Sequence, residues 1–150
     1  IRIKKIVHLK IEVSVFKTAT FHVQTRCATF EMNIENLKEK YLKLTKVCAE
    51  TDYTDKKSVR KNNSSVSEMY KIIELISKNE NGIEIQNFAE LLTVEENRTN
   101  LWVATHMLEK LNVDKKTERQ ALKIIKKVAK GNGTDAIGYK SWLSEYKLKN

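Results

Sequence analysis

The residues best suited to acid–base or metal chemistry in this chain are few and isolated. The segment NLWVATHMLEKLN, residues 100–112, holds His106, one of three histidines. A histidine that binds zinc or acts as a general base needs partners at a set spacing, and no H-E-x-x-H or comparable arrangement occurs. On a helix, Thr105 and Glu109 would point elsewhere or into the core. We therefore expect His106 to be a structural residue on the flank of a helix.

Other reactive patterns are also absent from the sequence. Cys27 and Cys48 lie far apart, without a CxxC pair or nearby histidines, so neither a zinc site nor a disulfide framework is predicted. Cys48 falls on the apolar stripe of a helix, where we expect a small core residue. The segment GNGTDAIG lacks the Lys-Ser/Thr of a phosphate loop. The sequence therefore predicts no catalytic residue, no cofactor, no metal and no enzyme.

One pattern that could bind a partner is a run of basic residues between 115 and 130. They recur mostly three and four positions apart, opposite the apolar stripe of the same helix: Lys116, Arg119, Lys123, Lys126, Lys127 and Lys130. One interpretation is a solvated helix face, since lysines near a helix C-terminus suit the helix dipole. The other is a surface that contacts nucleic acid phosphates or an acidic protein. Against nucleic acid, no exposed aromatic residue is interleaved to stack on bases.

The composition indicates which elements must position these residues. Proline is absent and glycine occurs four times, so the chain has fewer turn-forming residues than a β-sandwich or an α/β enzyme usually needs. A chain of 150 residues with 41% hydrophobic and 31% charged residues suits one folded domain. No apolar run approaches the roughly 20 residues that span a bilayer, and no signal-peptide pattern occurs. We therefore predict an all-α protein of the cytoplasm that does not enter a membrane.

Residues 1–31 differ in character from the rest of the chain. The start IRIKKIVHLKIEVSVF alternates with the period of a strand, whereas the period is helical from Met32 onward. Either residues 1–31 form a strand or hairpin packed on a helical domain, or they precede a start at Met32. An organellar targeting segment fits the pattern less well. We favour the start at Met32, which predicts an atypical extension over 1–31 and a helical domain over 32–150.

Periodic apolar residues predict five or six helices from residue 33 onward. In the first helix, which Asn33 can cap, they form one stripe: Ile34, Leu37, Tyr41, Leu44 and Cys48. The second helix has two predicted starts, one at Ser65, which heads a capping-box pattern, and one near Asp55. We favour the longer helix. A short helix over residues 85–92 follows.

Residues 100–112 are predicted to form the central helix of the core, because the segment is apolar over most of its circumference. Thr93 and Glu96 make a capping-box pattern ahead of it. Asp114 is expected to cap the basic helix, and Gly131 to end it in a left-handed conformation. The last helix presents its larger side chains at i, i+3, i+4 and i+7: Tyr139, Trp142, Leu143 and Tyr146.

Successive amphipathic helices joined by tight loops are typical of stacked helical hairpins. The segments RTNLWVATHMLEKL, AKGNG and AIGYKSWLSEYK resemble a family of small bacterial armadillo/HEAT-like domains of unknown function, over about residues 33–148. Some members resemble immunity proteins encoded beside bacterial toxins, and the family offers no catalytic residues. The strong packing pattern and the absence of a catalytic constellation predict a non-enzymatic domain that binds a protein through its helical surface, and the resemblance implies an immunity-type partner of a bacterial toxin. Binding of nucleic acid through residues 115–130 is the alternative.

Overall fold

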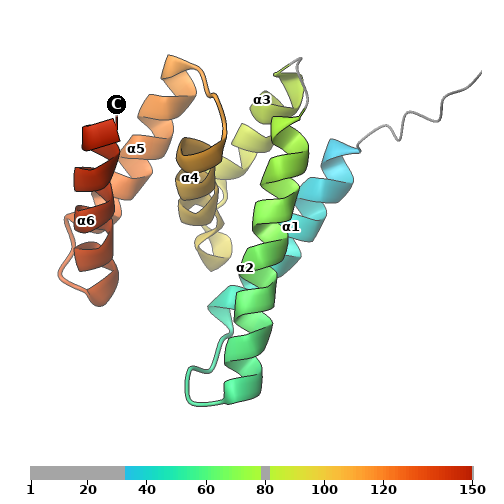
Figure 1. Cartoon of the computed structure of the whole chain (residues 1–150), viewed down its shortest axis with the longest axis vertical. Coiled ribbons are helices and arrows are strands. Elements are labelled where there is room, and N and C mark those ends of the chain that lie inside the picture. The colour runs from blue at the N-terminus through green and yellow to red at the C-terminus, as the bar shows by residue number, and fades with distance from the viewer. Residues whose placement is uncertain (1–32, 79–81, 150) are drawn as a thin grey trace, which may run out of the picture. The chain divides into compact units, whose positions relative to one another are not determined.

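The computed structural model describes residues 33–78 and 82–149, and most of these residues are helical. In chain order they form α1 (Ile34–Ala49), α2 (Lys56–Ser77), α3 (Ile83–Ala89), the 3₁₀ helices η1 (Glu90–Thr93) and η2 (Glu96–Arg98), α4 (Thr99–Lys110), α5 (Lys115–Ala129) and α6 (Thr134–Lys149) (Figure 1). No strand occurs within these two ranges. The predicted all-α class is therefore confirmed. The predictions for the extension over 1–31 lie outside the described residues.

Helices that follow one another along the chain pack against each other in most cases. α1 packs on α2, α4 packs on α5, and α5 packs on α6, so that α5 lies between α4 and α6 (Figure 1). α4 also contacts α1, α2 and η1. The predicted central position of the 100–112 helix is thus confirmed. Whether the helices repeat as stacked HEAT-like hairpins stays a prediction.

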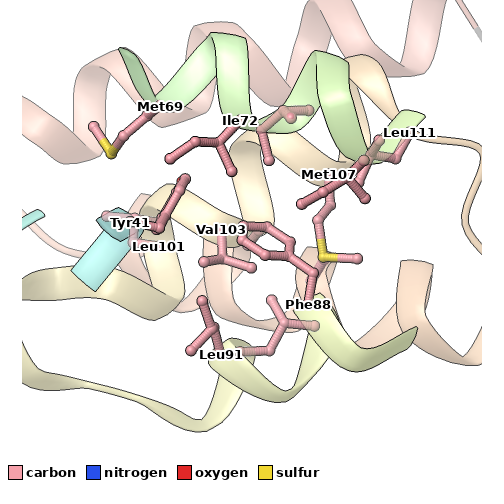
Figure 2. Close-up of a cluster of buried hydrophobic side chains, with 14 of the residues drawn as sticks. Tyr41, Met69, Ile72, Phe88, Leu91, Leu101, Val103, Met107 and Leu111 are labelled. Carbon is pink, nitrogen blue, oxygen red and sulfur yellow. The ribbon is translucent and has the colours of Figure 1, made fainter. Parts of the chain in front are cut away.

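The hydrophobic core forms where α4 meets the helices that precede it. Figure 2 shows large side chains from these elements directed toward one another: Tyr41 of α1, Met69 and Ile72 of α2, Phe88 of α3, Leu91 of η1, and Leu101, Val103 and Met107 of α4. All are buried. Because burying one such side chain contributes about 1.5–3 kcal/mol, the shared cluster holds these helices together.

Side-chain caps set the starts of three helices. Asn33, Asp55 and Asp114 each accept hydrogen bonds from two backbone N–H groups in the first turn of α1, α2 and α5 respectively. Such a cap contributes about 1 kcal/mol. The longer version of the second helix is therefore confirmed. Ser65 lies inside α2 and its hydroxyl donates to the Lys61 carbonyl at 2.9 Å, so it does not cap a helix.

The predicted capping box ahead of the central helix is wrong. α4 begins at Thr99, whereas the Thr93 hydroxyl donates to a carbonyl within η1 and Glu96 belongs to η2. The chain enters α4 through two consecutive residues in the left-handed region, Asn97 (φ 51°) and Arg98 (φ 58°). The 3₁₀ turns cause this difference, because they give the threonine hydroxyl a nearer acceptor before the helix starts.

The predicted left-handed end of the basic helix at Gly131 is also wrong. Lys130, the C-cap of α5, is right-handed, and the Gly131 N–H donates to the Val128 carbonyl at 3.0 Å. A Cβ on Gly131 would lie 3.2 Å from that oxygen, so close approach rather than a positive φ favours glycine here. In the described ranges, the glycine with a left-handed backbone is Gly82 (φ 66°), directly before α3.

Candidate functional site

The six predicted contact residues are all exposed, five on α5 and Lys130 at its C-cap, and we call them the basic face: Lys116, Arg119, Lys123, Lys126, Lys127 and Lys130. Ala121, Ile125 and Ala129 on the opposite side of the helix are buried. The predicted orientation of the helix is therefore confirmed. The role of the basic face stays a prediction.

The net positive charge of the helical part of the chain is concentrated on α5. Residues 114–130 contain seven Lys and Arg against two Asp and Glu, a net charge of +5. The other residues from 32 to 150 contain fifteen basic and fifteen acidic side chains, so their net charge is zero. The surface of this one helix is therefore the place where an anionic partner would be attracted.

The side chains of the basic face form no close ion pair within the part of the chain that the structure describes, although the charges of Lys116 and Arg119 help to lower the pKa of Asp114 and Glu118 respectively. None of its six side chains forms an ion pair there. The two acids of this segment are already engaged: Asp114 caps α5, and Glu118 binds Lys115 and the Tyr146 hydroxyl. The hydrogen bond from Lys115 holds the pKa of Glu118 below its usual range. Like charges three and four residues apart repel by a few tenths of a kcal/mol per pair, roughly 0.2–0.5.

Two hollows meet at Lys123 and Lys127. The first, of about 630 Å³, lies between α5 and the segment from η1 to the start of α4, and we call it the α4–α5 groove. Its apolar lining comes from Leu92, Leu101, Ile124 and Val128. Its charged lining comes from Glu95, Arg98, Lys123 and Lys127. The second hollow, of about 710 Å³, is open and lies among the side chains of the basic face and Leu122.

An unusual backbone conformation holds Arg98 at the edge of the groove. Left-handed φ values at non-glycine residues cost about 1–2 kcal/mol each, and two occur in succession at Asn97 and Arg98. The Arg98 N–H donates to the Glu95 carbonyl at 3.1 Å, and its guanidinium forms an ion pair with Asp135 of α6. These contacts fix the wall of the groove opposite α5. No sequence pattern indicated them.

His106 of α4 lies in the interior. His106 is 1% exposed, and its Nδ1 lies 2.8 Å from the Tyr41 hydroxyl of α1. Its ring packs on Tyr70 and Trp102, with centroid distances of 4.3 and 5.6 Å. Burial lowers the pKa of His106 to about 4 and raises that of Tyr41, so both groups are neutral near pH 7. The geometry supports a structural role, but the predicted position on a helix flank is wrong, because α1 and α2 cover the ring.

Glu109 links α4 to two other helices at the edge of this cluster. Its two carboxylate oxygens accept hydrogen bonds from the Tyr70 hydroxyl at 2.9 Å and the Trp142 indole N–H at 2.8 Å. Burial, followed by this hydrogen bond, raises the pKa of Tyr70 to about 12. These partners are 39 and 33 residues from Glu109 in sequence, so no spacing rule could have predicted them.

The remaining reactive groups show no arrangement that suggests chemistry. Cys48 is buried in α1, and burial raises the pKa of its thiol, which disfavours the nucleophilic thiolate. Over residues 33–78 and 82–149, no group of three or more His, Cys, Asp or Glu side chains could hold a metal ion. None of the helices in these ranges has the length and apolar character needed to cross a membrane. The basic face and the α4–α5 groove are thus the candidate site.

Comparison with protein-family models, curated proteins and solved structures finds no match for this chain. The resemblance to small bacterial armadillo/HEAT-like domains and the immunity-type role that it implies therefore stay predictions, as does the cytoplasmic location.

Proposed function

We propose that the helical part of this chain is a non-enzymatic domain that binds an acidic protein through the basic face of α5. The observation that supports this proposal is the concentration of charge: residues 114–130 hold a net charge of +5, and the rest of residues 32–150 is neutral. Repulsion within the basic face lowers the stability of the free helix, whereas acidic side chains of a partner would relieve it. Complementary charge would also speed association and select among partners.

A protein partner fits this surface better than nucleic acid does. Single-stranded nucleic acid is usually held by aromatic side chains that stack on bases. The aromatic residues of the neighbouring α6 are half-buried, and two of them already bind carboxylates: Trp142 binds Glu109 and Tyr146 binds Glu118. The α4–α5 groove has a partly apolar lining, and its apolar part suits aliphatic side chains rather than a phosphate backbone.

The test is a charge-reversal variant with a matched control. Lys123→Glu, Lys126→Glu and Lys127→Glu together change the net charge of the chain by six units at the basic face. Lys43→Glu, Lys57→Glu and Lys140→Glu together make the same change on α1, α2 and α6, where these side chains are exposed. Both variants should fold, as circular dichroism would check.

The probes are a fluorescein-labelled acidic peptide and labelled DNA, as single strand and duplex, followed by fluorescence anisotropy. We expect the acidic peptide to bind the full chain and the control variant, with affinity that falls as salt rises. The α5 variant should lose this binding. Equal binding to both variants would overturn the proposal, as would binding of DNA in preference to the peptide. Affinity capture from nuclease-treated lysate would then identify the natural partner.

A further inference from the structure

We infer that the α4–α5 groove takes an apolar side chain from an acidic segment of the partner, while flanking carboxylates pair with Lys123 and Lys127. This inference rests on the proposed function and names the part of the surface that gives it specificity. A charged face alone would bind many acidic proteins with similar affinity. A groove that requires an apolar side chain beside the acids would select among them.

The lining of the groove supports the apolar part of this inference. Leu92 and Leu101 are almost fully buried at its base, and Ile124 and Val128 of α5 are half-buried. The groove of about 630 Å³ is open to solvent and large enough for side chains of a partner. An aliphatic side chain that fills it would displace water from apolar surface on both walls. Burial of one leucine-sized side chain corresponds to about a tenfold to hundredfold gain in affinity.

The charges at the groove are asymmetric and orient the occupant. Lys123 and Lys127 lie one helical turn apart, with a rise of about 6 Å, and both also line the outer hollow of the basic face. On the opposite wall Arg98 is paired with Asp135, and Glu95 would repel a carboxylate. Acidic side chains of the partner are therefore expected on the α5 side only.

Hydrogen bonds tie the wall of the groove opposite α5 to the core. The Asn100 N–H donates to the Val94 carbonyl at 2.8 Å, and the hydroxyls of Thr99 and Thr45 lie 2.9 Å apart, joining the start of α4 to α1. A site whose walls are already ordered loses less entropy on binding. A nucleic acid backbone would engage the lysines but would leave this apolar hollow unfilled, because phosphates have no aliphatic group to insert.

The test compares two synthetic peptides of equal length and equal negative charge, measured by fluorescence anisotropy with the full chain. One peptide places leucines between glutamates, and the other has glutamine in place of each leucine. We expect the leucine peptide to bind about tenfold to hundredfold more tightly. Amide chemical shifts of Asn100 and Gln120, which line the groove, should move with the leucine peptide and much less with the glutamine peptide.

Two variants examine the groove directly. Ile124→Ala with Val128→Ala should reduce affinity for the leucine peptide toward that of the glutamine peptide, and should leave the latter unchanged. Glu95→Lys removes the repulsion on the far wall and should tighten acidic-peptide binding several-fold. Its matched control is Glu39→Lys, on an exposed position of α1. Since Glu95 is exposed, this substitution tests the groove even if the double alanine variant folds poorly.

The outcomes separate the two proposals. Equal affinity for both peptides, lost in the α5 charge-reversal variant, would overturn the groove inference and leave the proposed function standing. No binding of either peptide at millimolar concentration would overturn both. Equal effects of Glu95→Lys and Glu39→Lys would also contradict the groove inference, because position would then not matter.

Discussion

Lowering the pH from 7 to 5 should destabilise this fold measurably through a single side chain, His106. The imidazole is 1% exposed, contacts the Tyr41 hydroxyl and the rings of Tyr70 and Trp102, and has a pKa lowered to about 4 by burial. Glu109 opposes this shift weakly. In the unfolded chain a histidine titrates near its ordinary value of about 6.5. As the pH falls below that value, the unfolded state takes up a proton that the folded state excludes, so stability decreases.

The magnitude follows from the two pKa values. The pKa of His106 differs by about 2.5 between the folded and unfolded states, which corresponds to about 3 kcal/mol in the free energy of unfolding. This stability is present above pH 6.5 and is lost by about pH 4. Integration from pH 7 to pH 5 gives a loss of about 2 kcal/mol. For a helical part of this size, that loss lowers the melting temperature by about 8 °C.

The assay is urea unfolding followed by circular dichroism at pH 7, 6 and 5, on the full chain and on His106→Gln. Glutamine can still hydrogen-bond to Tyr41 but does not titrate, and His8 and His22 are present in both proteins. Carboxyl groups with lowered pKa, such as those of Asp52 and Asp114, also contribute to the free energy of unfolding, but that contribution is lost mainly below pH 5. The variant should therefore lose much less stability over this range than the full chain.

Equal losses of stability in the two proteins would refute the reasoning, because the pH dependence of the free energy of unfolding would then come from other groups. A His106 ring that titrates near pH 6.5 by NMR would contradict it independently. That result would mean that the imidazolium is tolerated in the interior.

Other substitutions test the packing and the helix ends by urea unfolding. Trp102→Ala should lower the free energy of unfolding by about 3 kcal/mol, since the half-buried indole packs on His106. An unchanged urea midpoint would show that the indole is not packed there. Asp114→Ala removes the cap of α5 and should cost about 1 kcal/mol, with reduced helicity; full retention of stability would contradict the capping geometry. Gly82→Ala should also cost about 1 kcal/mol, because a left-handed φ disfavours a Cβ even where no atom lies within 4 Å. An unchanged free energy of unfolding would indicate that the backbone at Gly82 is not left-handed.

Features that depend on neighbours in the sequence were predicted well. The cap at Asp114 and the opposed faces of α5 follow from spacings of two to four residues, so they can be recognised without tertiary contacts. The two wrong helix ends, at Thr93 and Gly131, concern local hydrogen bonds with more than one acceptor in reach. The geometry of the flanking turns selected the acceptor, and a short sequence pattern does not predict that geometry.

Features that join distant residues were missed, and they include the α4–α5 groove of the candidate site. The Tyr41–His106 contact spans 65 residues, and the Arg98–Asp135 ion pair spans 37. The groove needs Leu92 and Leu101 to face Ile124 and Val128, which requires α5 to pack on α4. Helical periodicity shows which face of a helix is apolar, but it does not show which other helix covers that face.

The sequence by itself therefore determined that this protein is helical, where most of its helices lie, and that one helix presents a strongly basic face. Those properties depend on the 3.6-residue period and on capping groups within a turn. Only the tertiary structure decided that His106 is buried and neutral, and that a groove with a partly apolar lining runs beside Lys123 and Lys127. The physical reason is that burial and the shape of a groove are properties of packed surfaces, which residues far apart in the sequence create together.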